Sequence, residues 1–570
     1  MSGKSVKLNN RGTGMVMGFF AILMIFALGV AYLSVTASSV LTSKRDTMRT
    51  RAMAAAEAGI DQAVAFIMDG GPGGETGGTW RTTHPSTDPN NHHSDTWYTG
   101  SLGNGATYKI CCRNGSGVTA GKIEITSVGT VTEGTSTTSR ALKAVLDCSK
   151  QNLNVWSNAI FGGVGQSGKS INGNVKIRGS VHLLGDGESY TDTDGDGHYD
   201  APEPYTDTNH NGHWDPGEPY TDLDGDGHYS AGEPFQDVNG NGVRDPALTV
   251  TDLAEDIGGN ADMGNNYNGM SATVRNLIPN PPTVSYGGET VDSLSAKLRV
   301  KHGKVNISGS ACVGYANQTG NTVKETMDGV YVSDGFGGNA GAASVHSDNG
   351  TANGYDLPDG TVTMPLITYG SYTKGGTTYA NYLTYLNQNA TVYTGDLTIV
   401  SNTALTISGA KGSLTIDSHG NMTVSGIVYV TGNISLGDKH GNITYSGSGT
   451  LVTPNSVYVH GNVLPKTKFA TTDTLGLVAA KNVELATGSG DSQLSMALAM
   501  YAQQQIISNK QNEVAGTMVT SYFSMSNVPS LYEVPELANH LPPAMPGSDP
   551  IYVASMSVVS WQEIAPNSCL

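Results

Sequence analysis

The pattern of apolar and polar positions first marks a long helical segment near the N-terminus. Met15–Leu33 is nearly continuous apolar sequence, and no charged residue occurs from Gly12 to Ser43. Because roughly 20 apolar residues in a helix span the hydrocarbon core of a bilayer, this run predicts a transmembrane helix. A cleaved signal peptide is the alternative, although its apolar core is usually shorter.

Helical periodicity continues beyond the apolar run. Over the alanine-rich segment Met48–Met68, apolar residues recur at helical spacing until Gly70-Gly71-Pro72 ends the pattern. We therefore expect one helix of about 80 Å from Met15 to Met68, embedded in a membrane first and amphipathic afterwards.

Alternating patterns predict β-structure for most of the remaining chain. Residues 70–100 are rich in Gly, Asn, His and Pro and predict a loop, whereas alternation from Ala106 to Asp147 predicts a small antiparallel sheet beside the helix. After Asn154, short strands recur every eight or nine residues, most clearly at Leu397, Leu405, Leu414 and Met422, and further strands follow at Ile427 and Val457. Three strands per turn would need about 25 residues, which favours a β-solenoid over the alternative of a β-sandwich.

The expected fold is therefore mainly β with one long N-terminal α-helix. We divide the chain into residues 1–70 (cytoplasmic tail, transmembrane helix and its extension), 71–150 (loop and small sheet), 151–189 (start of the β region), 190–248 (tandem repeats) and 249–570 (solenoid-like C-terminal region).

Charge is concentrated in the repeats. The chain has a net charge of −18, but between Tyr190 and Asp245 fourteen Asp and Glu residues face a single basic residue, Arg244. A strongly acidic block argues against nucleic acid, whose phosphates require Lys and Arg, and indicates a cation as the partner.

The acidic block consists of four consecutive units of fifteen residues. The first three fit the calcium-loop pattern D-x-[DN]-x-[DN]-G-x5-E, in which oxygen atoms at positions 1, 3, 5, 7, 9 and 12 surround one ion. In this interpretation the glutamate at position 12 closes each loop, and the histidine at position 7 offers its backbone carbonyl. The candidate Ca2+ ligands are Asp192, Asp194, Asp196, His198, Asp200 and Glu203; Asp207, Asn209, Asn211, His213, Asp215 and Glu218; Asp222, Asp224, Asp226, His228 and Glu233; and Asp237, Asn239 and Asn241.

The fourth unit lacks the closing glutamate, because Leu248 occupies position 12, and we expect it to bind calcium weakly or not at all. Only three residues separate successive loops, which leaves no room for the flanking helices of an EF-hand. The block instead resembles the tandem calcium repeats of thrombospondin type 3 and dockerin-like sequences. Aromatic residues at fixed places in each unit should stack the units into a rod. Without metal, the like charges should keep the segment disordered; a solvated acidic linker is the alternative.

The N-terminal region carries a family resemblance. The start Arg11-Gly12-Thr13-Gly14, the apolar run and the AxAAAEAGIDQA segment after it are similar to the corresponding region of PilX-type type IV pilus assembly proteins. The ending with LPPAMPG and SWQEI resembles the C-terminal part of some of these proteins. In the pilin family a glutamate stands five residues into the mature chain, whereas here Met17 or Phe19 occupies that place. The resemblance with this departure implies a minor pilin that acts in pilus assembly or adhesion.

Cysteines and the loops suggest which side of the membrane the chain occupies. Basic residues flank the apolar run on both sides and do not orient it. The five cysteines lack zinc-site spacing and indicate one or two disulfides, of which Cys148 with Cys111 or Cys112 is favoured. Disulfides and millimolar calcium both belong outside the cell. We therefore expect a single-pass inner-membrane protein with an extracytoplasmic C-terminal region that joins a surface filament.

No motif in the sequence indicates an enzyme. Gly163–Ser170 matches the P-loop pattern, but the residues after it alternate like a strand where a P-loop needs a helix. We expect a non-enzymatic protein whose partners are the inner membrane, pilus or secretion-filament subunits, and a surface ligand or polysaccharide. Two alternatives are open: a membrane-anchored calcium-binding surface protein outside any filament, and a carbohydrate-active enzyme on a solenoid.

Overall fold

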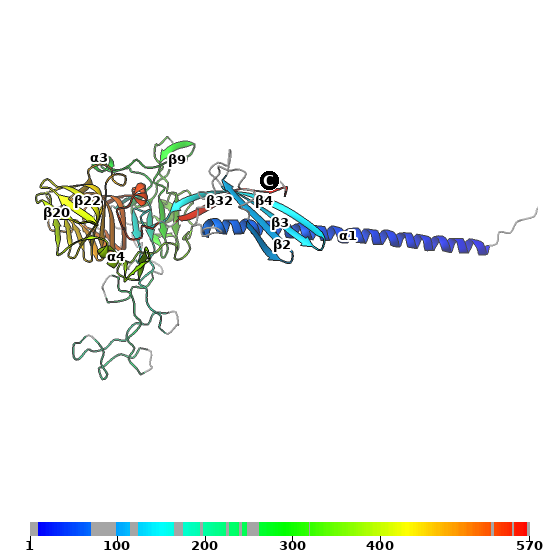
Figure 1. Cartoon of the computed structure of the whole chain (residues 1–570), viewed down its shortest axis with the longest axis horizontal. Coiled ribbons are helices and arrows are strands. Elements are labelled where there is room, and N and C mark those ends of the chain that lie inside the picture. The colour runs from blue at the N-terminus through cyan, green and yellow to red at the C-terminus, as the bar shows by residue number, and fades with distance from the viewer. Residues whose placement is uncertain are drawn as a thin grey trace, which may run out of the picture. The chain divides into compact units, whose positions relative to one another are not determined.

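The computed structural model describes residues 10–69, 98–114, 123–164, 175–193, 198–211, 213–223, 227–238, 242–247, 261–318, 320–439, 441–525, 529–549 and 552–566. The chain forms two compact units. Unit 1 contains Met1–Gln151 and Tyr552–Leu570, and unit 2 contains Asn152–Ile551. One long helix at the N-terminus is followed by a large β-rich region, which confirms the predicted fold class (Figure 1).

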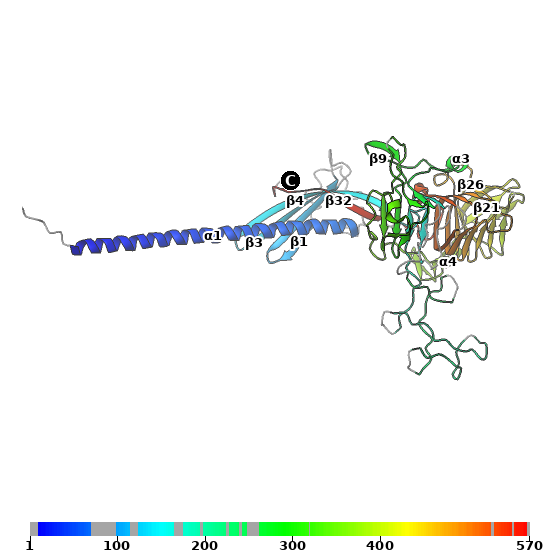
Figure 2. The same cartoon turned by 180° about the vertical axis from the view of Figure 1, so that it is seen from behind.

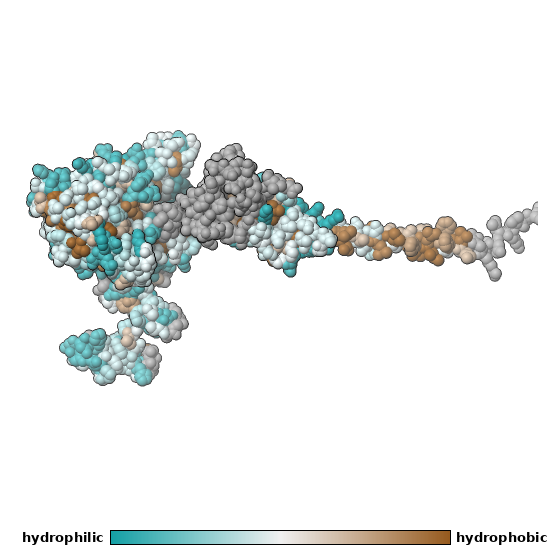
Figure 3. All heavy atoms as spheres, in the orientation of Figure 1, coloured by the Kyte–Doolittle hydropathy of each residue, from teal (hydrophilic) through white to brown (hydrophobic). Residues whose placement is uncertain are grey.

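Unit 1 is built on the predicted helix. Helix α1 runs without a break through Asn10–Asp69. Its large apolar side chains between Met15 and Leu41 are 49–82 % exposed, and Figure 3 shows this part of the helix as a hydrophobic rod. The helix is long and apolar enough to cross a membrane. Its second half is buried on one side, where it packs against the small sheet.

The sheet of unit 1 has the strand order β1-β2-β3-β4-β32, and the first four strands form an antiparallel meander. The strands are β1 (Tyr98–Gly103), β2 (Ala106–Asn114), β3 (Ile123–Glu133), β4 (Ser136–Asn152) and β32 (Tyr552–Ile564). Arg140 on β4 forms an ion pair with Glu563 on β32 at 2.8 Å. The sequence placed residues up to 570 in the solenoid-like region; the SWQEI segment instead completes this sheet, so unit 2 is an insertion between two neighbouring strands.

Small residues set the distance between α1 and the sheet. A Cβ atom on Gly129 of β3 would lie 2.0 Å from the carbonyl oxygen of Ala52, and one on Gly59 of α1 would lie 2.1 Å from Ser127 Oγ. Ala55 and Ala56 on the same helix face are fully buried. The alanine-rich segment that suggested the pilus resemblance is therefore the surface on which the sheet lies.

The predicted disulfide does not suit the register of this sheet. Cys111 pairs with Thr126 of β3, and Thr126 pairs with Lys143 of β4, so an entire strand separates β2 from β4. Neighbouring strands lie about 4.8 Å apart. A bridge from Cys148 on β4 to Cys111 or Cys112 would exceed the usual Cα separation of a disulfide, about 5.5–6 Å.

Unit 2 is a β-solenoid with short accessory elements. Its strands are β5 (Ile160–Gly162), β6 (Lys176–Arg178), β7 (Val181–Leu183), β8 (Asp262–Gly264), β9 (Thr283–Tyr286), β10 (Glu289–Asp292), β11 (Lys297–Val300), β12 (Val305–Asn306), β13 (Cys312–Val313), β14 (Gly329–Val332), β15 (Phe336–Gly337), β16 (Tyr372–Lys374), β17 (Thr377–Tyr379), β18 (Thr391–Tyr393), β19 (Leu397–Ile399), β20 (Leu405–Ser408), β21 (Gly412–Ile416), β22 (Asn421–Val430), β23 (Ile434–Leu436), β24 (Ile443–Thr453), β25 (Val457–Val459), β26 (Val463–Pro465), β27 (Thr474–Ala479), β28 (Asn482–Leu485), β29 (Ser495–Ser508), β30 (Glu513–Met525) and β31 (Ser530–Tyr532). Its helices are α3 (Ala272–Arg275), η2 (Gly341–Ser344), α4 (Tyr382–Gln388) and η3 (Pro535–Asn539).

Parallel pairing between successive coils defines the solenoid (Figure 1 and Figure 2). Ile434 pairs with Val457, Val457 with Val483, and Val483 with Ile506, so each partner lies one coil further along the chain. These spacings agree with the predicted coil of about 25 residues. Part of the strand periodicity that suggested such a coil comes from a meander instead, because β20, β21 and β22 pair antiparallel. Tight turns such as Asp417–Gly420, whose Asp417 carboxylate accepts hydrogen bonds from two backbone N–H groups, allow only a meander.

The coils do not stack in chain order. The row that starts at β18 continues through β22, β24, β27, β29 and β30, and then through β5, β7, β11 and β14. At the junction, Val519 of β30 pairs with Phe161 of β5, which lies far earlier in the chain. The chain therefore enters the solenoid in its middle, builds toward one end, crosses to the other end and returns to the middle.

A buried histidine near this junction gives the solenoid a pH dependence. His182 on β7 is 2 % exposed and its Nε2 lies 2.7 Å from Tyr355 Oη. Burial, with Arg299 and Lys301 nearby, lowers the pKa of His182 to about 3. The folded chain therefore holds a neutral imidazole where the unfolded chain takes up a proton below about pH 6.5. This contribution to stability is complete above pH 6.5 and is lost as the pH falls below it.

We expect wild-type unit 2 to lose more stability than His182→Gln between pH 7 and pH 5, by about 1.4 kcal/mol per pH unit below 6.5. Urea unfolding of both proteins at the two pH values measures the difference. Glu533, whose pKa burial raises to about 7, shifts stability in the opposite direction, but it is common to both proteins and cancels in the comparison. Equal pH dependence of the two proteins would contradict the conclusion that His182 is neutral in the folded chain.

Candidate metal-binding arm

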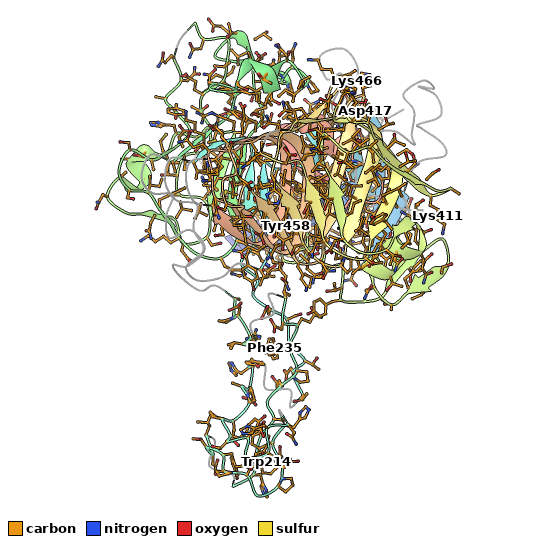
Figure 4. The ribbon with its side chains drawn as sticks, turned by 90° about the vertical axis from the view of Figure 1, so that its left-hand side faces the viewer. Trp214, Phe235, Lys411, Asp417, Tyr458 and Lys466 are labelled. Carbon is orange, nitrogen blue, oxygen red and sulfur yellow. The ribbon has the colours of Figure 1, made fainter. Side chains whose placement is uncertain are left out.

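The acidic repeats form a hairpin that we call the arm, residues 188–245. Tyr190 bridges Phe235 and Tyr205 bridges Tyr220, both in antiparallel pairing. Reciprocal backbone hydrogen bonds flank both bridges: Thr191 donates to Pro234 and Gln236 to Ser189, while Thr206 donates to Pro219 and Thr221 to Pro204, each at 2.8 Å. Counted in steps of fifteen residues from Tyr190, repeat 1 therefore lies against repeat 4, and repeat 2 against repeat 3. Figure 4 shows Trp214 far from the solenoid and Phe235 between it and the solenoid.

We number the candidate metal loops by their first residue: Asp192 (loop 1), Asp207 (loop 2), Asp222 (loop 3) and Asp237 (loop 4). The first carboxylate of loops 3 and 4 accepts a hydrogen bond from the glycine N–H at position 6, at 3.0 and 2.8 Å. These bonds bring the N–H of position 6 back to the side chain of position 1 in loops 3 and 4.

Loop 2 is described at every predicted ligand position. The amide groups of Asn209 and Asn211 both donate to Asp215 Oδ2, at 2.6 and 2.8 Å, and the N–H of Asn211 donates to Asp207 Oδ1 at 3.2 Å. The N–H of His213 donates to Asn211 Oδ1 at 2.8 Å, while the role of its carbonyl as a ligand stays a prediction. The structure thus brings the side chains of positions 1, 3, 5 and 9 together.

The chemistry of this donor set fits a calcium ion. Carboxylate, amide and carbonyl oxygens are hard ligands of the kind Ca2+ prefers. Within the ranges that the structure describes, no group of three or more His, Cys, Asp or Glu side chains is arranged to hold a metal. Six of the predicted ligands, Asp194, Asp196, Asp224, Asp226, Asn239 and Asn241, lie outside the described residues.

Two of the three glutamates of the sequence motif lie at loops that the motif did not predict. The carboxylate of Glu218 accepts hydrogen bonds from the N–H groups of Thr208 and Asp215, at positions 2 and 9 of loop 2. Glu203, however, accepts the equivalent bonds from Leu223 and Ser230 of loop 3. Glu233 accepts them from Thr193 and Asp200 of loop 1. The motif assigned Glu203 to loop 1 and Glu233 to loop 3; the hairpin exchanges them.

A fourth glutamate, missed by the sequence analysis, serves loop 4. The carboxylate of Glu188 accepts hydrogen bonds from the N–H groups of Val238 and Asp245, at 2.6 and 3.1 Å. Glu188 is 1 % exposed, and the other three glutamates are equally buried, at 3–7 %. The signal was present in the sequence, because 188, 203, 218 and 233 are spaced by fifteen residues. A repeat that starts at Tyr190 begins two residues after Glu188 and therefore leaves this glutamate out.

Aromatic side chains fill the hairpin in two clusters. Tyr190, Tyr199 and Phe235 make edge contacts nearer the solenoid, and Arg244 lies over Tyr190 and Tyr199. At the far end, Trp214 stacks on Tyr229 with ring centroids 4.5 Å apart, and the surrounding rings are Tyr205 and Tyr220. The aromatic residues thus join opposite repeats, rather than only successive ones.

The arm is attached to the solenoid through loop 4. Val238 is buried against Val164 and Tyr522. Tyr369 Oη donates to the carbonyl of Asp237 at 2.9 Å, and Tyr522 Oη donates to Asp245 Oδ2 at 3.0 Å. Loop 4 is therefore both a candidate metal loop and the base of the arm.

The other motif considered lies mostly outside the described residues. Of the P-loop match, Gly163 and Val164 follow β5, and residues 165–174 are not described. The first element after them is the strand β6, as the sequence analysis expected.

Comparisons with known proteins give little identification. No family model and no curated protein matches the chain. Among solved structures, the competence-associated pilin ComZ from Thermus thermophilus is similar, with 15 % sequence identity and a TM-score of 0.44 over 91 % of this chain and 98 % of that chain. A TM-score of this size does not by itself establish a common fold.

Proposed function

We propose that the chain is a minor-pilin-like component of a type IV pilus or related filament. It would display an extracellular β-solenoid with a calcium-stabilised arm for assembly or adhesion. The observation that carries the proposal is the division of α1 into an exposed apolar half and a half packed on a small sheet. A soluble domain would not leave so much apolar surface uncovered.

The inserted solenoid supports a display function. The chain leaves unit 1 at the end of β4 and returns to it at β32, which is the neighbouring strand of the same sheet. Unit 2 is therefore connected to unit 1 by two chain segments. The helix and small sheet would serve as the anchoring part of the subunit, and unit 2 would be the part that meets other molecules.

Mechanical shearing of the cell surface tests the proposal. We expect the protein in the sheared filament fraction together with other filament subunits. Recovery only in washed membranes would instead support an anchored surface protein outside any filament.

An arginine in the apolar half of α1 should abolish anchoring. Phe26 is 71 % exposed in the middle of the apolar stretch. Placing Arg at the centre of a membrane helix costs about 3 kcal/mol on insertion scales. We expect Phe26→Arg to lower the amount of protein in carbonate-washed membranes and in sheared filaments several-fold. Ala54→Arg, an exposed position beside the sheet on the same helix, is the matched control and should remain near the wild-type level.

Calcium should protect the arm from proteolysis. The four acidic loops repel one another, and bound cations would offset that repulsion. We expect chymotrypsin to cut within residues 190–235 rapidly in a chelator and slowly with millimolar calcium, while the fragments of the solenoid persist in both. Mass spectrometry of the fragments locates the cuts; identical cleavage in both conditions would contradict calcium stabilisation.

A further inference from the structure

We infer that Glu188, Glu203, Glu218 and Glu233 position loops 4, 3, 2 and 1, respectively, so that the arm has four equivalent metal loops rather than three. This inference concerns how the arm is built and rests on the proposed calcium function only for the ion count. It assigns Glu188 to the arm and transfers Glu203 and Glu233 to loops other than those of the sequence motif.

The same three hydrogen bonds recur at each loop. Each glutamate carboxylate accepts from the N–H groups of loop positions 2 and 9, as described above. In addition, the backbone N–H of each glutamate donates to the carbonyl of position 9 of that same loop. These bonds join Glu188 to Asp245, Glu203 to Ser230, Glu218 to Asp215 and Glu233 to Asp200, at 2.8–3.0 Å. Four independent repetitions of one arrangement indicate a structural rule of the hairpin.

The burial of the glutamates explains why they must be so bonded. A buried carboxylate without partners is costly, whereas bonds from N–H groups to a charged acceptor are strong. In loop 2 these bonds lower the pKa of Glu218, with the N–H of Asp215 as the largest cause. In loop 2 both oxygens of the Glu218 carboxylate hold the two ends of the loop, so the side chains of Asp207, Asn209 and Asn211 are left to surround an ion. The glutamates are therefore positioning residues.

Under this assignment loop 4 is equivalent to the other three loops, whereas the sequence motif made it a weak or non-binding loop. Leu248 at position 12 suggested a defective loop, but the hairpin supplies Glu188 from the opposite strand. Loop 4 also keeps Asp237, Asn239, Asn241 and Gly242, and Asp245 stands at position 9. We therefore expect the arm to hold four calcium ions.

Hydrogen–deuterium exchange of the full-length protein in detergent tests the assignment. Four variants, Glu188→Gln, Glu203→Gln, Glu218→Gln and Glu233→Gln, each replace one accepting oxygen by an amide nitrogen that cannot accept. With millimolar calcium present, so that the wild-type arm is folded, we expect exchange to accelerate about tenfold or more in one loop per variant. The affected segments should be residues 237–245, 222–230, 207–215 and 192–200, in that order. Glu289→Gln, an exposed position in β10, is the control, and peptides from β29 report that the solenoid stays folded.

The outcomes separate the inference from the proposed function. Acceleration at 192–200 in Glu203→Gln, with no effect of Glu188→Gln at 237–245, would overturn the exchanged assignment in favour of closure within each repeat. Loss of protection throughout the arm in every variant would overturn it as well. Calorimetric titration with calcium should give four ions for the wild type and fewer for Glu188→Gln. If no calcium binds but the exchange pattern is as expected, the positioning role stands and the calcium function fails.

Discussion

Replacing Gly129 by valine should separate helix α1 from its sheet. The Cβ atom of the new side chain would lie 2.0 Å from the carbonyl oxygen of Ala52 and 2.4 Å from the backbone nitrogen of Ala56. Both are helix backbone atoms, so no change of side-chain rotamer can relieve the clash. Overpacking usually costs about 1–3 kcal/mol, and here the helix itself must move, so we expect a loss of about 3 kcal/mol or more in unit 1.

Hydrogen–deuterium exchange in the second half of α1 and in β3 measures this effect. Thr126→Val is the matched control, because Thr126 is on the same strand but faces away from the helix and is half-buried. The control should retain wild-type protection, and the peptides of unit 2 should be unchanged in both variants. Normal protection of α1 in Gly129→Val would mean that the helix does not depend on this close contact.

The helix could be predicted from the sequence because the signal is local. An uninterrupted helical pattern from Met15 to Met68 gave a helix that the structure extends only slightly, to Asn10–Asp69. The close contact that Ala56 and Gly59 make with the sheet was not predicted, because it depends on which strand residues lie opposite them. The place of β32 was not predictable, because a strand's own residues do not identify its neighbours and this one returns only after the whole of unit 2, Asn152–Ile551.

The arm shows the same limit at smaller scale. The calcium-loop motif predicts which residues surround each ion position, since these lie within a few residues of one another. It cannot predict which glutamate holds the loop, because a glutamate three residues after position 9 and one from the opposite strand satisfy the same bonds. Glu218 meets its own loop only because the hairpin turns there. The exchange of Glu203 and Glu233 between loops follows from the antiparallel bridges at Tyr190 and Tyr205, which the sequence does not reveal.

The order of the solenoid coils could not be predicted from the sequence either, because every coil has the same sequence period whichever coils lie next to it. A substitution at the junction makes the order measurable. Phe161 is fully buried in β5 and pairs with Val519 of β30, which makes its coil an internal one. In a stack where each coil contacts only its neighbours, weakening an internal coil loosens both sides, whereas weakening an end coil causes local fraying.

We therefore expect Phe161→Ala, at a cost of about 3–5 kcal/mol, to accelerate exchange on both sides of the junction, in β7 and β11 and equally in β29 and β30. Leu397→Ala is the control, because Leu397 is 1 % exposed in β19, in the end coil. It should accelerate exchange near β19 and β23 and leave the junction protected. If Phe161→Ala affected only residues 160–332, the pairing of β5 with β30 would contribute little, and the two halves of the solenoid would be separately stable. Acceleration on both sides would instead make the two halves a single cooperative unit that forms only when β30 reaches β5, after most of the chain is available.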